Sequence, residues 1–209
     1  AAMILKRAGW VPPGVEEQAV YLIALQQWPD VADLGAPAVD LLVARLADRD
    51  TGVQAGAAES LSRIGAPAAP PLVRLLGEEA HQGPVGETLV RIGEAAVEPL
   101  IRALDEETLR RAAAGVLVRI GGPAVGALIT ALGRPDSGQV AAEVLRAMGE
   151  PSVDALVLAL ANGDALVRQR AGDVLIDLGD VSIGPLIGAL GHPDDTIRLE
   201  AIDTLIRVG

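Results

Sequence analysis

The hydrophobic residues of the chain recur in a pattern whose copies follow one another at nearly constant spacing. Each copy opens with an aliphatic residue and a glycine, and the steps between successive glycines are 30, 28, 28, 28, 30 and 30 residues. A fixed period of this length is typical of stacked helical repeats. The glycines that mark the copies are Gly35, Gly65, Gly93, Gly121, Gly149, Gly179 and Gly209.

Each copy carries two apolar stripes at helical spacing. Counted from the glycine, aliphatic residues stand at +4, +7, +8 and +11, as in Val39, Leu42, Val43 and Leu46 of the first copy, which is one face of an α-helix. Counted back from the next glycine, leucine stands at −4 and alanine in most copies at −8, which predicts a second helix. The glycine itself is expected to end that second helix in a left-handed conformation.

The sequence therefore predicts an all-α, right-handed α-α superhelix of about six helix pairs. The pairs are expected at residues 35–64, 65–92, 93–120, 121–148, 149–178 and 179–209. Residues 1–34 form a separate N-terminal lead-in or capping segment in this interpretation.

The N-terminal segment holds all the aromatic residues of the chain, which are Trp10, Tyr21 and Trp28. Residues 1–9 match the end of a repeat, and a helix is expected from residue 15 until Pro29 ends it. We interpret the aromatic residues as the seal of the exposed end of the stack. The alternative is that Trp10 anchors a protein partner, since tryptophan is common at binding hot spots.

Two blocks of sequence, IGxxAVxxLIxAL and D-x-x-[VI]-R-xxA, together resemble the short HEAT-like repeats found in phycobilin lyase subunits and in many bacterial multi-repeat proteins. The second block is present as Asp164, Val167, Arg168 and Ala171, and again as Asp194, Ile197, Arg198 and Ala201. In that family the Asp and Arg of neighbouring units are regarded as a ladder that bridges the stack. The resemblance implies a broken ladder at Gln54, at residues 81–84 and at residues 137–138, with short or irregular second helices at the last two places.

Composition narrows the chemistry that the chain can carry. There is no cysteine, which excludes disulfides, thiolate metal sites and thiol nucleophiles. With 17 basic and 28 acidic residues the net charge is −11, which argues against nucleic acid as a partner. Neither a signal peptide nor an uninterrupted membrane-spanning segment is recognisable, so a cytoplasmic protein without membrane contact is expected.

No motif supports catalysis or cofactor binding. The two histidines, His81 and His192, lie in copies far apart, and paired His-Glu dipeptides of the di-iron HEAT-like hydroxylases are missing. P-loop, dinucleotide-binding and G-x-S-x-G sequences are missing as well. We therefore expect no enzyme, no cofactor and no metal.

The second helices offer the main candidates for partner binding. Glu59–Arg63, Glu87–Arg91 and Asp203–Arg207 are expected to pair within a helix at i, i+4. Two places depart from that scheme: Gly115 replaces the acid expected before Arg119, and Asp173 and Asp177 are like charges one turn apart. Because such charges are costly without a partner, we predict contact with another protein at Arg119, Asp173 and Asp177. Arg63 and Arg91 are candidates for the same contact, because they stand at the matching position of their second helices.

The function predicted from the sequence is a non-catalytic scaffold or protein–protein interaction module that presents a concave helical surface. The partner is another protein or an adjacent domain, and the segment is expected to belong to a longer chain. End-to-end self-association is a further expectation, because Leu199, Ile202, Leu205 and Ile206 lack an obvious polar cap. The alternative is a bilin-lyase-like subunit that binds a chromophore, while the irregular copies weaken a third possibility, an engineered repeat.

Overall fold

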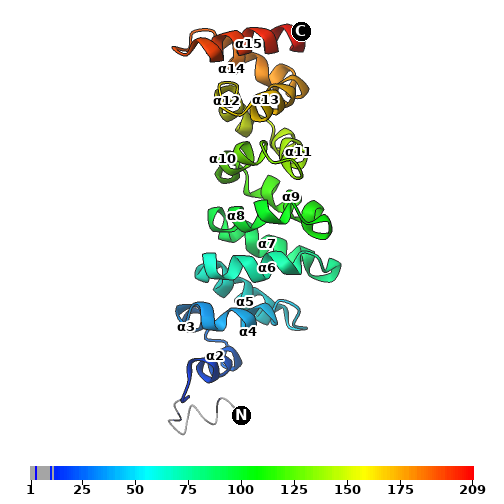
Figure 1. Cartoon of the computed structure of the whole chain (residues 1–209). Coiled ribbons are helices and arrows are strands. Elements are labelled where there is room, and N and C mark those ends of the chain that lie inside the picture. The colour runs from blue at the N-terminus through cyan, green and yellow to red at the C-terminus, as the bar shows by residue number, and fades with distance from the viewer. Residues whose placement is uncertain (1–2, 4–9, 11) are drawn as a thin grey trace. The chain divides into compact units, whose positions relative to one another are not determined.

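The computed structural model describes residues 3, 10 and 12–209, and every regular element within these residues is helical. Figure 1 shows the helices in chain order. The chain divides into two compact units, residues 1–99 and residues 100–209. The expected match of residues 1–9 to the end of a repeat lies outside the described residues, except for Met3.

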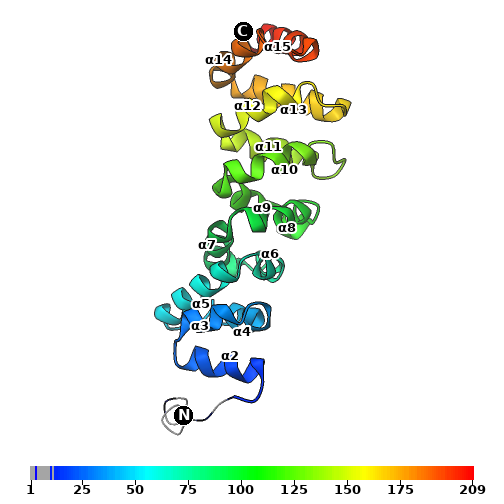
Figure 2. The same ribbon diagram turned by 90° about the vertical axis from the view of Figure 1, so that its left-hand side faces the viewer.

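The first unit stacks helix pairs in two layers. Helices α3, α5 and α7 contact one another in succession, and α4 packs against both α5 and α6 (Figure 2). Its elements are α2 (Val15–Ala24), α3 (Trp28–Asp33), η1 (Ala36–Ala38), α4 (Val39–Val43), α5 (Thr51–Ile64), η2 (Ala66–Ala68), α6 (Ala69–Leu75), η3 (Glu79–His81) and α7 (Gln82–Ile92). The division between the units falls within α8 (Glu94–Ala103).

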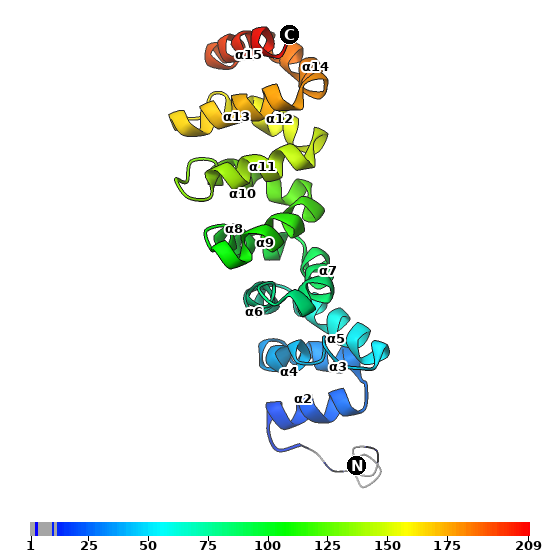
Figure 3. The same ribbon diagram turned by 90° about the vertical axis from the view of Figure 1, so that its right-hand side faces the viewer.

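The second unit repeats the same arrangement. Helices α9, α11, α13 and α15 form one layer, and α10, α12 and α14 form the other (Figure 3). Its elements are α9 (Glu107–Ile120), α10 (Gly122–Ala131), α11 (Gly138–Met148), α12 (Glu150–Ala159), α13 (Ala165–Leu178), α14 (Asp180–Ala189) and α15 (Asp195–Val208). The prediction of an all-α stack of helix pairs is confirmed in both units.

The leucine at +7 of each copy forms the centre of the core. Leu42, Leu72, Leu100, Leu128, Leu156 and Leu186 are all fully buried. The leucines at −4 of the second helices are equally buried from Leu61 to Leu175. Burying a leucine side chain contributes about 1.5–3 kcal/mol, so the two positions together account for the regularity of the stack.

The repeat glycines have a backbone conformation that other residues rarely adopt. From Gly35 to Gly179 their φ angles lie between 58° and 71°. Their ψ angles are close to that of Gly121, which is −135°, so they fall outside the left-handed helical region that the sequence predicts. This combination is available almost only to glycine. Each glycine N–H still closes the preceding helix, and each carbonyl accepts the first hydrogen bond of the next, as in Ala124 N–H to Gly121 O at 2.8 Å.

Two second helices are shorter than the rest, as the sequence predicts. Helices α7 and α11 have 11 residues each, whereas α5, α9, α13 and α15 have 14. Pro84 stands in the first turn of α7, and Pro135 stands in the turn before α11. A proline is not tolerated in the interior of a helix, so neither helix can begin a turn earlier.

The N-terminal helix ends earlier than expected. Helix α2 stops at Ala24, and Pro29 stands in the first turn of α3 instead of ending a longer helix. A proline has no N–H to lose at that position, which explains why it begins a helix. Helix α3 contacts α5 in the same way that α5 contacts α7, so α2 and α3 form a helix pair of their own.

An aspartate caps several second helices, and one cap has a titration that can be tested. The Asp194 carboxylate accepts the Thr196 N–H at 2.8 Å at the start of α15. This backbone hydrogen bond holds the pKa of Asp194 below its ordinary value. A carboxylate whose pKa is lower in the folded than in the unfolded state adds stability above its unfolded pKa, and that stability is lost as the pH falls through the folded pKa.

The variant Asp194→Asn is therefore expected to be less stable than the parent at neutral pH by a margin that shrinks or reverses at about pH 3. Asparagine keeps the capping oxygen but does not titrate. Denaturation of both chains at the two pH values measures the margin. A margin that does not change with pH would show that the charge of Asp194 contributes nothing.

Candidate functional site

The charged residues of the second helices pair between neighbouring helices. Arg63 Nη2 lies 3.1 Å from Asp33 Oδ1 of α3, and Arg91 Nη1 lies 3.8 Å from Glu59 Oε2 of α5. In the second unit Arg207 Nη2 lies 3.1 Å from Asp173 Oδ1. The expected pairs Glu59–Arg63 and Asp203–Arg207 within one helix are therefore wrong, because each arginine reaches back to the preceding second helix.

The charged side chains at the two places where the sequence suggested an unsatisfied charge also have partners. Asp177 Oδ2 lies 2.6 Å from Arg146 Nη2 of α11, and Asp173 is held by Arg207, so each of these carboxylates has its own cation. Arg119 has an interaction partner although Gly115 replaces the acid in its helix. The premise that these charges lack partners is wrong, and their role in binding another protein stays a prediction. Exposed pairs of this kind contribute about 0.2–1 kcal/mol each.

A second set of polar contacts closes the turn inside each repeat. Arg168 Nη1 donates to the Asn162 carbonyl at 2.7 Å, and Arg198 Nη1 donates to the His192 carbonyl at 2.7 Å. Arg110 Nε makes the corresponding bond to the Leu104 carbonyl at 2.8 Å. Donor and acceptor are six residues apart in each case, and we call this contact the turn clamp. The repeat arginine therefore bonds to the turn within its own repeat. It does not form the bridge between neighbouring repeats that the resemblance implies.

Glutamine makes the same turn clamp in the first two copies, which lie in the first unit. Gln54 Nε2 donates to the Asp48 carbonyl at 2.6 Å, and Gln82 Nε2 donates to the Leu76 carbonyl at 2.9 Å. Gln54 therefore does not interrupt the contact that the repeat arginine makes. An amide carries the N–H donor that this bond needs, so the substitution of arginine by glutamine keeps the contact.

The turn clamp of α11 comes from the next repeat. The clamp position is Gly138, which has no side chain, and Arg170 of α13 fills the space with its guanidinium. Nη1 of Arg170 donates to the Arg134 carbonyl at 2.9 Å and also to the Leu132 carbonyl. A Cβ at residue 138 would overlap this Nη1 atom, so the glycine and the distant arginine form one arrangement.

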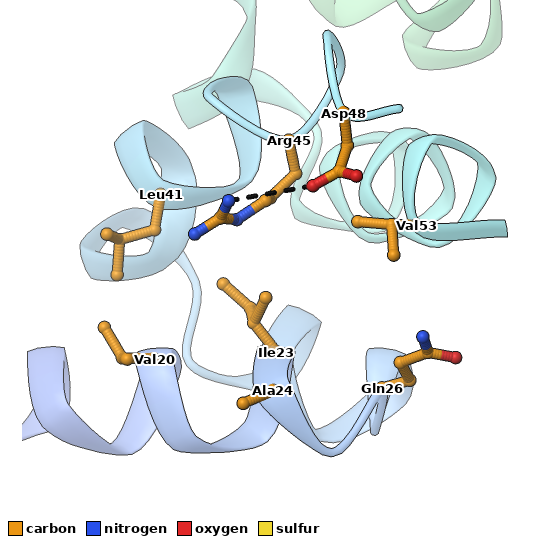
Figure 4. Close-up of a pocket in the computed structure, with 8 residues that line it drawn as sticks. All are labelled: Val20, Ile23, Ala24, Gln26, Leu41, Arg45, Asp48 and Val53. Carbon is orange, nitrogen blue, oxygen red and sulfur yellow. Dashed lines mark ion pairs between the residues drawn. The ribbon is translucent and has the colours of Figure 1, made fainter. Parts of the chain in front are cut away.

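The first unit contains a groove between α2 and α4. Figure 4 shows aliphatic side chains from both helices and from α5 facing this space, with an ion pair along one wall. The side chains that line it are Val20, Ile23, Ala24, Gln26, Leu41, Arg45, Asp48 and Val53. Val20 is 54% exposed, and Ile23, Leu41 and Val53 are half-buried. The groove is therefore an accessible apolar surface bordered by charge.

Two of these residues break the repeat pattern. At +6 the other copies carry proline or alanine, and the first copy carries Leu41. At +10 the last four copies carry alanines that are buried, whereas the first copy carries the exposed Arg45. Neither substitution is required by the packing of the stack. The sequence analysis considered only charged residues of the second helices and therefore missed Leu41 and Arg45. Their departure from the other copies at +6 and +10 is the signal that identifies them in the sequence.

The polar wall of the groove is preset by local contacts. Arg45 Nη1 lies 3.7 Å from Asp48 Oδ2, and Asp48 Oδ1 accepts the Asp50 N–H at 3.1 Å. The Arg45 guanidinium lies across the groove above Ile23 (Figure 4). Gln26, at the end of α2, has a φ of 54°. A residue other than glycine in the left-handed region costs free energy and is found often at binding sites.

The aromatic residues take different positions. Trp10 is 40% exposed and packs edge-to-face on Tyr21 with ring centroids 5.5 Å apart. Trp28 packs against Gly56 of α5, and its carbonyl accepts a hydrogen bond from Ser60 Oγ at 3.1 Å. Trp28 therefore packs between α3 and α5 inside the first unit, while Trp10 keeps an accessible ring beside α2. The interpretation of the aromatic residues as a seal stays a prediction.

The histidines have local partners. His81 Nδ1 lies 3.0 Å from Glu78 Oε2, and His192 Nδ1 accepts the Asp194 N–H at 3.1 Å. Within the described residues no cluster of His, Asp and Glu is suited to hold a metal ion. In the same part of the chain, none of the helices is long and apolar enough to cross a membrane.

Comparison with known proteins gives one family match and several distant structural similarities. Residues 53–78 match the PBS lyase HEAT-like repeat. These residues run from α5 through the first helix of the next copy. A search of curated proteins finds no relative.

Three similar solved structures are remote in sequence. An engineered protein is 20% identical, with 99% of this chain and 94% of that chain covered and a TM-score of 0.33. The archaeal HEAT-like repeats protein from Thermococcus onnurineus NA1 is 15% identical, with 95% and 98% covered and a TM-score of 0.35. Human deoxyhypusine hydroxylase in complex with glycerol is 20% identical, with 94% and 80% covered and a TM-score of 0.32.

These scores are too low to transfer a site or an activity to this chain. The class of repeat protein is therefore indicated by the matched repeat and by the helix pairs of this chain. The PBS lyase HEAT-like repeat at residues 53–78, together with the same helix pair recurring through both units, supports a HEAT-like repeat protein.

Proposed function

We propose that the chain is a non-catalytic scaffold that binds another protein, and that the groove between α2 and α4 receives a segment of that partner. The observation that carries the proposal is the pair of substitutions in the first copy, Leu41 at +6 and Arg45 at +10, which build an apolar floor and a cationic wall. Because the stack forms in the other copies without these side chains, they are available for recognition.

The lining determines the kind of segment that fits. Val20, Ile23, Leu41 and Val53 favour an aliphatic side chain, since removal of apolar area from water is the main source of affinity in such a site. Arg45 Nη1 and Asp48 Oδ2 are 3.7 Å apart, which is too long for a hydrogen bond and makes this a loose ion pair. A carboxylate of the partner can accept two N–H bonds from the guanidinium, which is a stronger contact. The expected ligand is a peptide segment with an aliphatic anchor next to an acidic residue.

Selection from a random peptide display library on the folded chain tests this proposal. We expect the selected peptides to share an aliphatic residue beside Asp or Glu. Their affinity is expected to fall about tenfold or more in Val20→Glu and in Arg45→Ala, as is usual for central contact residues. Titration of synthetic peptides, followed by fluorescence anisotropy, gives the affinities.

Leu158→Glu is the matched control. Leu158 lies on α12 and is 59% exposed, close to the 54% of Val20, so its replacement introduces the same charge at a similar surface position away from the groove. It should leave peptide binding unchanged. Peptides that lose affinity in Arg119→Glu and not in Val20→Glu would place the site on the second helices and overturn the proposal.

Bilin binding, the alternative function, has a direct readout in the same samples. An absorption shift of a free bilin on mixing with the chain, together with failure to enrich any peptide, would favour a chromophore-binding subunit. We expect no such shift, because the groove offers aliphatic side chains and one arginine, with no aromatic ring in its lining.

A further inference from the structure

A polar hollow lies between α13 and α15 of the second unit. Its volume is about 210 Å³, which is below the range of pockets for drug-sized molecules and gives room for one long side chain. Arg168 and Gly172 of α13 and Glu200, Asp203, Thr204 and Arg207 of α15 line it. The two helices pack directly against each other, so the hollow lies between neighbouring repeats and not at the end of the stack.

Gly172 gives the hollow its room. A Cβ at this residue would lie 3.8 Å from Leu160 Cδ2 and 4.0 Å from Thr204 Oγ1, which is ordinary van der Waals contact. Ala114 and Ala142 stand at the same position of α9 and α11. The space between α13 and α15 is therefore wider by a methyl group than it would be with the alanine of the earlier copies.

Glu200 has no counterpart in the other second helices. The residues at its position in the earlier copies are Gly56, Pro84, Ala112, Val140 and Arg170. Glu200 is half-buried although the stack forms in every other copy without an acid at this position. Stacking therefore does not account for its carboxylate.

The preceding step of the same layer shows that such a space accepts a guanidinium group. Between α11 and α13, Arg170 places its guanidinium beside Gly138 and donates to the Arg134 carbonyl at 2.9 Å. Glu200 stands in α15 where Arg170 stands in α13. A carboxylate has no N–H to donate, so α15 supplies no guanidinium from this position to the space in front of α13.

The two arginines of the hollow have other partners. Arg168 Nη1 donates to the Asn162 and Gly163 carbonyls at 2.7 and 3.1 Å. Arg207 Nη2 donates to Asp173 Oδ1 at 3.1 Å. Both guanidinium groups are thus directed at the borders of the hollow, where they hold the turn and the neighbouring helix.

The remaining polar groups of the hollow are hydrogen-bond acceptors. In the part of the chain that the structure describes, the carboxylates of Glu200 and Asp203 have neither a hydrogen bond nor an ion pair. The Thr204 hydroxyl is 2% exposed and donates its proton to the Glu200 carbonyl at 2.7 Å, so only its lone pairs remain. With Asp173 at the border, three carboxylates face two guanidinium groups, which leaves a net charge of −1.

We propose that this hollow binds an arginine side chain of a partner protein. A guanidinium has five N–H donors in one plane and no acceptor. It can be shared by Glu200 and Asp203, which lie one helical turn apart, and the Thr204 oxygen offers a third acceptor. Lysine directs its donors from a single point and matches this set less well. The site goes beyond the proposed groove, which lies in the first unit and takes an acidic residue beside an aliphatic one.

Titration of the isotope-labelled chain with Nα-acetyl-arginine amide, followed by the NMR signals of the backbone amides, tests the proposal. We expect saturable shifts concentrated around Gly172 and Thr204, with a Kd on the order of 1 mM, as a ligand of this size allows. Nα-acetyl-citrulline amide has the same shape without the charge and should cause no such shifts. Absence of saturable shifts with the arginine ligand, or equal shifts with Nα-acetyl-lysine amide, would overturn the assignment to arginine.

Two variants locate the site. Glu200→Gln is expected to weaken binding about tenfold, because a charge-assisted hydrogen bond becomes a neutral one. Thr204→Val is expected to weaken it about threefold through loss of one acceptor. This variant should fold, since valine stands at the same position of α9, α11 and α13 as Val116, Val144 and Val174. Circular dichroism checks the fold of both variants.

Glu143→Gln is the matched control. Glu143 is an exposed acid of α11 in the same unit, so its replacement changes the net charge as much as Glu200→Gln does. It should leave the affinity unchanged. Equal weakening in both variants would mean that the cation is attracted only by the net charge of −11, and it would contradict a site between α13 and α15.

The two proposals are tested independently. The arginine ligand has no acidic group, so the amide signals of α2 and α4 should not respond to it. Failure of the arginine site leaves the groove of the first unit standing, and peptides that fail to bind in the groove leave the arginine site standing.

Discussion

Replacing Gly56 by alanine is expected to lower the free energy of unfolding by about 1–3 kcal/mol, as overpacking in a well-ordered core does. Gly56 is buried in α5, and an added Cβ would overlap the indole ring of Trp28. The Trp28 carbonyl accepts a hydrogen bond from Ser60 Oγ at 3.1 Å, so the backbone of α3 cannot move away from α5 without breaking this contact. The substitution therefore pushes the α2–α3 pair away from the rest of the first unit.

Urea denaturation followed by circular dichroism measures the stability of both variants. Tryptophan fluorescence reports on the first unit alone, since the two tryptophans of the chain, Trp10 and Trp28, both lie there. Gly115→Ala is the control. Gly115 lies in the middle of α9, and an added Cβ there would meet only open space. At this position the same substitution should raise stability by about 0.5–1 kcal/mol through helix propensity alone. Equal gains in both variants would mean that Trp28 does not pack on Gly56.

Replacing Arg170 by methionine is expected to cost about 1.5–3 kcal/mol, the usual effect of removing a hydrogen bond to a charged group. The Leu132 and Arg134 carbonyls lose their donor, and Gly138 has no side chain to replace it. Methionine keeps most of the apolar length of arginine, so the loss reports the polar contact. Arg111→Met, at an exposed position of α9, should change stability by less than about 0.5 kcal/mol.

The partnership of Gly138 and Arg170 predicts that their substitutions are not additive. Gly138→Gln alone is expected to be strongly destabilising, because its Cβ would meet Arg170 Nη1 and would lie 2.6 Å from the Leu132 carbonyl oxygen. In the background of Arg170→Met the first conflict is removed, and glutamine can donate to Leu132 as Gln82 does to Leu76 at 2.9 Å. The double variant should therefore lose less stability than the sum of the two single variants.

Urea denaturation of the four chains gives the coupling free energy of this double-mutant cycle. Residues that touch each other commonly couple by about 0.5–3 kcal/mol. Additive losses would contradict the arrangement, since they would show that the guanidinium does not occupy the space beside Gly138. Helix α13 lies next to α11 in the same unit, so the cycle also measures how firmly these two repeats are joined.

The copies of the repeat assign different tasks to positions that are otherwise equivalent. The +6 and +10 positions support packing in the later copies and form the groove in the first. The proposed groove thus arises from substitutions that stacking does not demand.

The helix pairs, their order and most of the core were determined by the sequence alone. The period of the glycines and the leucines at +7 and −4 depend on local geometry, because a helix repeats its face every 3.6 residues. Leu42 and Leu61 could be assigned to the core for that reason. The two short helices α7 and α11 were also predictable, from Pro84 in the first turn of α7 and Pro135 in the turn before α11.

The partners of the polar side chains were decided only by the tertiary structure. Arg63 can reach Glu59 within its helix or Asp33 of another helix, and the sequence favours the nearer one. The distance between stacked helices selects Asp33. In the same way, no local rule connects Gly138 to Arg170, which are separated by 32 residues. A long flexible side chain pairs with whatever packing brings within its reach, whereas an aliphatic residue needs only the buried face that the helical period defines.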